Sequence, residues 1–216
     1  MVPPYFDEPD FEGHTCCDLS FEKLALEQGY RKVAGIDEVG RGALFGPVCA
    51  AAVVFDITRV PVGIDDSKKL SAKQRLQLAE SIKEAAEDYS IAYVDSQIID
   101  QINILEATRE AMRRAISGLK NEPDYLLCDG IVITGTKIPQ KNIIKGDNRS
   151  VSIAAASILA KVERDWLISR LDIIFPGYDL RSNKGYATFK HVKALKVLGP
   201  TAYHRITFRG VLCREL

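Results

Sequence analysis

The sequence lacks any run of 18 consecutive apolar residues, so no segment is long and apolar enough to cross a bilayer as a helix. Its first residues, MVPPYFDEPDFEG, are acidic and proline-rich, whereas a secretory signal peptide begins with basic and then apolar residues. The five cysteines show no Cys-x-x-Cys spacing, and their odd number argues against a disulfide framework. We therefore expect a cytoplasmic protein with reduced thiols and no membrane partner.

Soft metal ligands are also scarce. His14, Cys16 and Cys17 lie close together, but no second pair of such residues matches them, so we do not expect a zinc site. The other two histidines, His191 and His204, have no catalytic partner that the sequence indicates. We expect structural roles for both.

The chain has no net charge, because its 29 basic and 29 acidic residues balance. Residues 1–29 hold seven acids and one base, which leaves 28 bases and 22 acids, a net charge of +6, on residues 30–216. The last 36 residues contain eight Lys or Arg, interleaved with aromatic residues, and one acid, Glu215. This composition suits contacts with phosphates and sugars, although a solvated basic helix would share it.

Hydrophobic periodicity predicts a mixed-sheet α/β domain. Short apolar runs predict strands at residues 32–38, 48–55, 89–94, 125–129 and 142–145. Helical spacing predicts helices at about 71–87, 97–119, 152–171 and 188–199, the first of which begins with a capping box from Ser71 to Gln74. The small Ala/Ser face of the 152–171 helix would let its backbone lie close on the sheet. We divide the chain into an acidic N-terminal extension, residues 1–30, and one domain, residues 31–216.

Residues 35–46, GIDEVGRGALFG, fit two kinds of site. The spacing of the last three glycines, after a strand, approaches the fingerprint that binds a dinucleotide pyrophosphate. That fingerprint requires a helix directly after the glycines, whereas Pro47 and the strand-like VCAAAVVF follow here. Asp37 and Glu38 would also repel the phosphates, so we favour a metal site and keep a dinucleotide oxidoreductase as a rival that a nucleotide titration would test.

Acids recur near the ends of the predicted strands and near glycines, at Asp37, Glu38, Asp129 and Asp147. Functional groups of an open α/β sheet gather outside strand ends, so these acids can converge on one point. Converging carboxylates repel one another unless a cation neutralises them, and all-oxygen ligation suits Mg²⁺ or Mn²⁺. Taken singly, each acid could instead start a turn or cap a helix.

Cations flank these acids in the glycine segment, on the loop before the 71–87 helix and beside Asp147; they are Arg41, Lys68, Lys69, Lys145 and Arg149. Glycines such as Gly40 and Gly42 would let backbone amides approach an anion closely. Acids surrounded by cations suggest a metal centre that acts on a phosphodiester. The residues thus indicate metal-dependent phosphoryl transfer or hydrolysis on nucleic acid.

Several segments resemble the motifs of bacterial ribonuclease HII, the type 2 ribonuclease H family; they read GIDEVGRGALFGPV, DSKKLS, DYLLCDG, KGDNRSVSIAAASILAKVERD and NKGYATFKHVKAL. The resemblance implies a ribonuclease H-like fold, in which helices flank a five-stranded mixed sheet, with a small helical C-terminal substrate-binding element at about 176–216. It also implies an endonuclease that hydrolyses the RNA strand of RNA–DNA hybrids. Such an enzyme would cut 5′ of ribonucleotides embedded in duplex DNA, leave 3′-hydroxyl and 5′-phosphate ends, and serve ribonucleotide excision repair and DNA replication.

The resemblance also assigns roles to residues. The catalytic and metal-binding carboxylates fall on Asp37, Glu38, Asp129 and Asp147, and the implied cofactor is Mg²⁺ or Mn²⁺, two ions per site. The implied substrate-binding residues are Gly40, Arg41 and Gly42, which would read the 2′-hydroxyl, Tyr186, which would sense the RNA–DNA junction, and the phosphate contacts Lys68, Lys69, Lys145, Arg149 and Lys184. Departures from the family pattern at Val39, Ala43 and Phe45 bear on fine substrate preference. A non-catalytic hybrid-binding protein is the alternative, but it would not need clustered acids; we expect a monomer.

Overall fold

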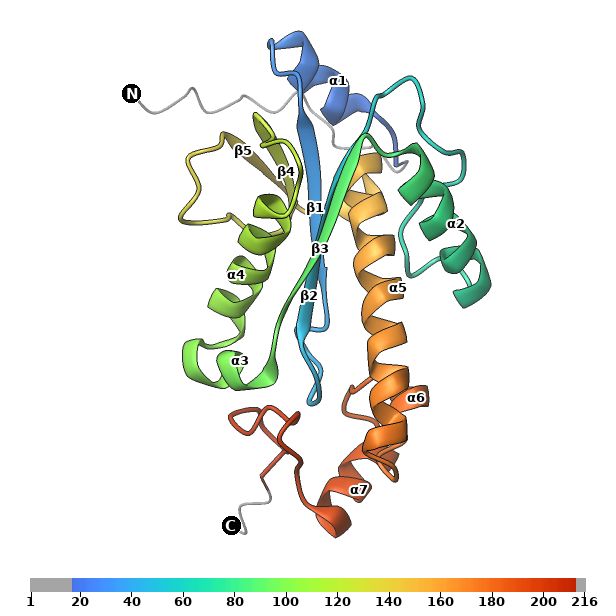
Figure 1. Ribbon diagram of the computed structural model, residues 1–216, viewed down its shortest axis with the longest axis vertical. Coiled ribbons are helices and arrows are strands. Elements are labelled where there is room, and N and C mark those ends of the chain that lie inside the picture. The colour runs from blue at the N-terminus through green and yellow to red at the C-terminus, as the bar shows by residue number, and fades with distance from the viewer. Residues whose placement is uncertain (1–16, 213–216) are drawn as a thin grey trace.

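The computed structural model describes residues 17–212, which form a five-stranded sheet with helices on both faces (Figure 1). The strands are β1 (Val33–Val39), β2 (Val48–Val54), β3 (Asp88–Val94), β4 (Tyr125–Asp129) and β5 (Gln140–Ile143), in the order β3-β2-β1-β4-β5. β2 pairs antiparallel with both β1 and β3, whereas β4 pairs parallel with both β1 and β5. The predicted mixed sheet is therefore confirmed.

The helices are α1 (Ser20–Glu27), α2 (Ala72–Ala85), α3 (Ser96–Ile102), α4 (Ile104–Ser117), α5 (Val151–Ile174), α6 (Leu180–Asn183) and α7 (Phe189–Leu198), with a 3-10 turn, η1, at Gly146–Asn148. Helices α3 and α4 pack on one face of the sheet, and α2 and α5 pack on the other (Figure 1). None of these helices, which cover the described part of the chain, is long and apolar enough to span a membrane.

The core lies on both faces of the sheet, because alternate residues of β2 point to opposite sides. Val48, Ala50 and Ala52 join the buried cluster that includes α4. Cys49, Ala51 and their neighbour Val53 join the cluster that includes α5. All seven residues of β2 are buried, so this strand contributes to the core on both faces of the sheet.

Helix α5 lies directly on β1, as the small Ala/Ser face of this segment predicts. Every residue from Val151 to Ala160 is buried. A Cβ atom at Gly35 of β1 would stand 2.1 Å from the carbonyl carbon of Ser152, so glycine is required there. The close contact fixes the start of α5 against the middle of the sheet.

The single helix predicted at 97–119 is wrong, because the structure divides this segment into α3 and α4 at Asn103. Asn103 has φ +67°, a left-handed conformation that a continuous helix cannot contain. Its side-chain oxygen accepts hydrogen bonds from the amides of Leu105 and Glu106, which starts α4. The capping box at Ser71 and Gln74, in contrast, is confirmed at the start of α2.

Two other boundaries differ from those expected. The strand predicted at 142–145 ends at Ile143, because Lys145 adopts a left-handed conformation with φ +55°. Residues Ser20–Glu27, which we assigned to the N-terminal extension, form α1, whose Phe21 and Ala25 pack on the β4 side of the sheet. His14 and Cys16 lie outside the described residues.

The chain after α5 forms what we call the C-terminal element, residues 176–212 of the described chain, which contains α6 and α7. Its buried side chains, such as Tyr178 and Leu195, pack around Leu44 and Phe45 from the turn that follows β1. Helix α5 extends past the sheet to reach this element (Figure 1). One helix thus connects the strand ends to the C-terminal element.

Candidate active site

Three parallel strands bring acids to one edge of the sheet. Since β1, β4 and β5 run in the same direction, their carboxyl ends lie together. Ile36 pairs with Cys128, which sets Asp37 beside Asp129. Asp147 follows β5 on η1. Asp37 and Asp147 are only 4% and 3% exposed, so both carboxylates lie below the surface.

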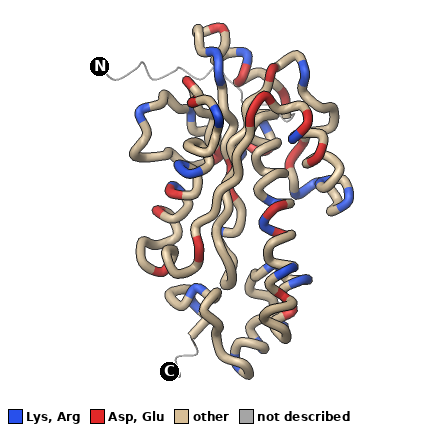
Figure 2. The backbone as a smooth tube through the Cα atoms, viewed as in Figure 1, with Lys and Arg blue, Asp and Glu red and all other residues tan. Residues whose placement is uncertain are grey.

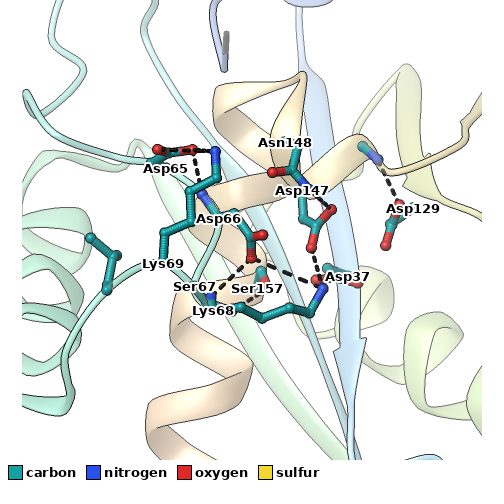
Figure 3. A network of polar contacts seen from close by, with 12 residues as sticks. Asp37, Asp65, Asp66, Ser67, Lys68, Lys69, Asp129, Asp147, Asn148 and Ser157 are labelled. Atoms are coloured by element: carbon teal, nitrogen blue, oxygen red, sulfur yellow. Dashed lines mark hydrogen bonds and ion pairs between the residues drawn. The ribbon is translucent and has the colours of Figure 1, made fainter. Parts of the chain in front are cut away.

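Local hydrogen bonds fix the orientation of these side chains (Figure 3). Asp37 Oδ1 accepts from the amide of Glu38 at 2.7 Å, and Asp129 Oδ1 accepts from the amide of Gly146 at 2.7 Å. Asp147 Oδ2 accepts from Lys68 Nζ at 2.7 Å. Each of the three aspartates therefore keeps at least one bond that holds its carboxylate at the sheet edge.

The acids border a cleft with a volume of about 340 Å³. Its lining residues come from five parts of the chain, namely the end of β1, the 67–75 segment, the end of β4, helix α5 and the C-terminal element. They are Asp37, Glu38, Val39, Ser67, Lys68, Arg75, Asp129, Ser157, Lys161 and Tyr186. Asp147 is held to this cleft through Lys68. The sequence-predicted residues Asp37, Glu38, Asp129, Lys68 and Tyr186 therefore face one cavity.

The carboxylates raise one another's pKa. Burial raises the pKa of Asp37 well above its ordinary value, and the charges of Glu38 and Asp129 raise it further. Burial raises the pKa of Glu38 to about 7, although the neighbouring Arg41 guanidinium opposes this rise. Burial is also the main cause that raises the pKa of Asp129, and the charge of Asp147 adds to it. Positive charge near Asp37, Glu38 and Asp129 is therefore too small to offset their burial and mutual repulsion.

The donor set fits divalent cations such as Mg²⁺ or Mn²⁺. All four groups are hard carboxylate ligands, and Glu38 Oε2 is buried without a hydrogen-bond partner. Among residues 17–212, no three His, Cys, Asp or Glu side chains stand close enough to enclose a metal ion by themselves. Mg²⁺ usually keeps several waters and is held by one or two carboxylates together with substrate phosphates. An open row of carboxylates along a cleft suits that mode of binding.

The two lysines of the DSKKLS segment point in different directions (Figure 3). The Lys68 ammonium contacts Asp147, and this hydrogen bond is the main cause that raises the pKa of Lys68. Lys69 instead contacts Asp65, at 3.0 Å, on the outer side of the loop. The structure thus brings Lys68, and not Lys69, to the carboxylates.

The turn after β1 is held by two buried arginines whose guanidinium groups bind backbone carbonyls. Arg164 of α5 donates to the carbonyls of Phe45, Pro47 and Lys184. Arg205 of the C-terminal element donates to the carbonyls of Gly46 and Arg41. Both arginines are 0% exposed, so they join the turn, α5 and the C-terminal element into one rigid unit. These residues were missed in the sequence, because their partners are distant backbone atoms.

Within this turn, Gly40 and Gly42 differ. Gly40 has φ +93°, and a Cβ there would stand 2.2 Å from Arg164 Nε. Gly42 has nothing within 4 Å of the position that a Cβ would take. Arg41, between them, is exposed and reaches Glu38 at 3.4 Å. The open side of the turn at Gly42 is accessible to a substrate.

The remaining predicted substrate residues are spread around the cleft. Tyr186 is half-buried, with Lys161 Nζ 6.0 Å and Arg164 Cζ 5.5 Å from the centre of its ring. Lys184 donates to Ser169 Oγ at 2.6 Å, and Arg149 lies 5.2 Å from the ring of Phe21 on α1. Lys145 is exposed beside η1. Of this group, only Tyr186 lines the cleft.

Sequence reasoning missed other groups beside the cleft. Asp66 is 7% exposed and accepts from the amide of Lys68 at 2.9 Å. Arg75 of α2 holds this loop by donating to the carbonyls of Ser67 and Leu70. Ser157 and Lys161 face the cleft from α5. Their spacing of four residues on one helix was the available signal, since such residues share a face.

Comparison with known proteins agrees with this geometry. The sequence model of one family, described as Ribonuclease HII, matches residues 34–211. The chain belongs to the ribonuclease HII family. It is therefore a ribonuclease H enzyme, which favours catalysis over the non-catalytic binding protein that we considered as the alternative.

Relatives of this ribonuclease HII family member match over most of their length. The ribonuclease HII of Pelobacter propionicus is 52% identical over 193 residues, 89% of this chain and 88% of the relative. The ribonuclease HII of Syntrophotalea carbinolica is 49% identical over 201 residues, 93% of this chain and 96% of the relative. The crystal structure of the ribonuclease H2 from Pyrococcus horikoshii OT3 matches with a TM-score of 0.72 and 25% identity, and covers 84% of this chain and 95% of that one. The predicted ribonuclease H-like fold is confirmed.

Proposed function

We propose that this chain hydrolyses the RNA strand of RNA–DNA hybrids and cuts on the 5′ side of ribonucleotides embedded in duplex DNA. The observation that carries the proposal is the row of carboxylates, Asp37, Glu38 and Asp129, on a cleft that Tyr186 also lines. The family supports ribonuclease H activity, and the acids at the strand ends supply the groups that metal-dependent hydrolysis requires. Proposed products carry 3′-hydroxyl and 5′-phosphate ends.

The four carboxylates are proposed to hold two divalent cations, Mg²⁺ or Mn²⁺. When bound, such ions neutralise the scissile phosphate, lower the pKa of the attacking water and stabilise the leaving oxygen. Asp37 would be the central ligand of this set, because it is buried, adjoins Glu38 on β1 and lies beside Asp129 on β4. Asp147 and Lys68 form a pair at the side of the cluster, where the ammonium limits repulsion among the acids.

Recognition of RNA must involve the 2′-hydroxyl, because that group distinguishes a ribonucleotide from a deoxyribonucleotide at a given sugar. We assign this contact to backbone amides of Gly40 to Gly42, with Arg41 beside the phosphate. The open space at Gly42 supports the assignment. The ring of Tyr186, which also lines the cleft, is assigned to the deoxyribose on the other side of the junction.

Lys68 is proposed to contact a phosphate at the cleft itself. Phosphates farther from the cut are proposed to contact the cations outside the cleft, without reading sequence; these cations are Lys69, Lys145, Arg149 and Lys184. Basic segments recur along α5 and in the C-terminal element (Figure 2). A monomeric state, a cytoplasmic location and a part in ribonucleotide excision repair remain predictions from the sequence.

The proposal is tested with three end-labelled duplexes of one sequence: all DNA, DNA with one ribonucleotide, and an RNA–DNA hybrid. With Mg²⁺ or Mn²⁺, the native chain should make a single cut 5′ of the lone ribonucleotide and several cuts in the hybrid. All-DNA duplex, and every reaction with chelator, should stay intact. Cleavage of the all-DNA duplex, or cleavage that survives the chelator, would contradict the proposed reaction.

A further inference from the structure

The two histidines for which the sequence indicates no catalytic partner contact each other in the structure. His191 of α7 and His204 of the following loop are 0% and 1% exposed, and their Nε2 atoms lie 3.1 Å apart. Phe45 and Tyr178 enclose His204, with ring centroids each 4.9 Å away. The pair is therefore buried inside the C-terminal element, next to the turn that follows β1.

The other two ring nitrogens determine where the protons lie. His204 Nδ1 receives a hydrogen bond from the amide of Thr201, at 2.9 Å, so this nitrogen must be the acceptor. His191 Nδ1 lies 2.9 Å from the carbonyl oxygen of Tyr186, which can only accept, so this nitrogen must carry a proton. In a neutral pair, His204 then donates through Nε2 to His191 Nε2.

These bonds form one directed chain from the Thr201 amide, through His204 and His191, to the carbonyl of Tyr186. Every donor in it has an acceptor, which a doubly protonated imidazole at either position would not allow. Burial lowers the pKa of both histidines, in keeping with the neutral state. The chain ends on the backbone of the residue whose ring lines the cleft.

The local backbone explains why Tyr186 needs such an anchor. Lys184 and Gly185, just before it, both have positive φ, at 53° and 85°. The amide of Tyr186 donates to Asn183, and its carbonyl accepts from the amide of Thr188 as well as from His191. Among the described residues, the His191 imidazole supplies the one side-chain hydrogen bond to the Tyr186 carbonyl.

We propose that His191 and His204 are positioning residues for Tyr186. Their directed hydrogen bonds fix the Tyr186 backbone, and so the place of its ring in the cleft, on which the preference for an RNA–DNA junction depends. This inference rests on the role proposed above for Tyr186.

The test uses two substitutions of His191 that each keep one of its two hydrogen bonds. An Asn side chain places its amide near the position of a histidine Nδ1, and a Gln side chain places it near that of Nε2. His191→Asn therefore keeps a donor for the Tyr186 carbonyl, whereas His191→Gln keeps only the bond to His204. The readout is the ratio of kcat/KM for duplex DNA with one ribonucleotide to kcat/KM for a uniform hybrid.

This ratio is internal to each protein sample, so a partly unfolded fraction does not change it. We expect His191→Asn to keep the native ratio within about threefold, and His191→Gln to lose about tenfold, as for one lost hydrogen bond. Equal ratios for the two variants, whether both native or both reduced, would overturn the positioning role. Tyr186→Ala is the control that removes the ring itself.

The controls separate this inference from the function on which it rests. If native protein and Tyr186→Ala showed the same ratio, the role of Tyr186 would be wrong, and the inference would fail with it. If Tyr186→Ala lost the preference but His191→Gln kept it, only the positioning role would be wrong. Long-range ¹H–¹⁵N NMR spectra add a readout without substrate. His191 should carry its proton on Nδ1 and His204 on Nε2, and the opposite assignment would contradict the proposed direction of the hydrogen bonds.

Discussion

Gly40 and Gly42 lie two residues apart, but the structure gives them different reasons to be glycine. At Gly40 the left-handed backbone and the Arg164 side chain leave no room for a methyl group. At Gly42 nothing in the described chain occupies that space. The first glycine is therefore required for folding, and the second is available for contact with the substrate.

This difference predicts opposite outcomes for two alanine variants. Gly40→Ala should lower the free energy of unfolding by about 2 kcal/mol or more, because of strain and overlap. Gly42→Ala should change it by less than about 0.5 kcal/mol but lower kcat/KM on single-ribonucleotide duplex by about tenfold or more, because the methyl blocks close approach. Urea unfolding and cleavage assays provide the measurements. A Gly42→Ala protein with native activity would count against the proposed 2′-hydroxyl contact.

The histidine pair predicts how stability depends on pH. Burial, and then the charge of His191, lower the pKa of His204 to about 4, whereas an unfolded histidine titrates near 6.5. A lowered folded-state pKa means that the neutral histidine stabilises the fold above pH 6.5, and that this contribution is lost as pH falls from 6.5 to 4. Burial also lowers the pKa of His191; its hydrogen bond to the Tyr186 carbonyl and the charge of Asp179, from the loop before α6, oppose this shift without reversing it. Lys190 on α7 contacts Asp179 at 3.8 Å.

His204→Asn is the matched variant, because it keeps an acceptor for the Thr201 amide but cannot titrate. Between pH 6.5 and 4, native protein should lose about 3 kcal/mol more unfolding free energy than the variant, as a shift of this size implies. Chemical unfolding across this range, with chelator present, makes the comparison. Parallel curves for the two proteins would show that His204 is not buried in its neutral form.

At the scale of elements, the packing of α5 on the sheet depends on one position of β1, Gly35. A methyl group at Gly35 would overlap backbone atoms of α5, which cannot rotate away. Gly118 at the end of α4 is the matched control, since a methyl there would meet Ser90 Oγ at a similar 2.2 Å, and that hydroxyl can rotate.

We expect Gly35→Ala to lower the free energy of unfolding by about 3 kcal/mol, and Gly118→Ala to lower it by about 1 kcal/mol or less. Urea midpoints with unchanged slopes would report both values. Equal losses for the two variants would mean that α5 can move away from β1, contrary to the contact described here.

Elements with a clear local pattern could be predicted from the sequence, whereas those that depend on distant partners or on an unusual backbone conformation could not. The capping box of α2 lies within four residues, and the acids Asp37 and Asp129 follow recognisable strands. The break between α3 and α4 depends on a left-handed Asn103, a conformation that periodicity does not reveal. Helix α1 was missed because the residues that it packs against lie far away in the sequence.

The role of α1 shows how far apart such partners can be. Glu22 is 3% exposed, and its Oε1 accepts from the amide of Ser152 at 2.9 Å and from the hydroxyl of Ser150 at 2.6 Å. This carboxylate therefore satisfies donors at the start of α5, where negative charge is favourable. In the sequence, Glu22 is one acid among seven in a segment whose composition indicates only an extension.

At the scale of the whole molecule, α5 connects the two halves of the proposed site. Its first turns lie on β1 behind the carboxylates, and its later turns carry Arg164 and pack against the C-terminal element (Figure 1). Asp37, Glu38, Asp129 and Tyr186 thereby line one cleft. Under the proposed function, this arrangement would let the carboxylates and Tyr186 act on the same stretch of duplex.

The most direct test of this account asks whether the acids at the carboxyl ends of the parallel strands perform metal-dependent cleavage. Asp129→Asn keeps the shape of the side chain but removes its charge, and Asp56→Asn is the control. Asp56 also follows a strand, but β2 runs antiparallel to β1, so this partly buried acid lies at the opposite edge of the sheet.

The measurement is the rate at which each protein cuts duplex DNA with one ribonucleotide, as a function of Mg²⁺ or Mn²⁺ concentration. We predict that Asp129→Asn loses activity by at least about a hundredfold at every metal concentration while it remains folded. The reason is that Asp129 is proposed to hold a metal ion that stabilises the transition state. Asp56→Asn should cut at the native rate. Native cleavage by Asp129→Asn would contradict the assignment of the active site to this edge of the sheet.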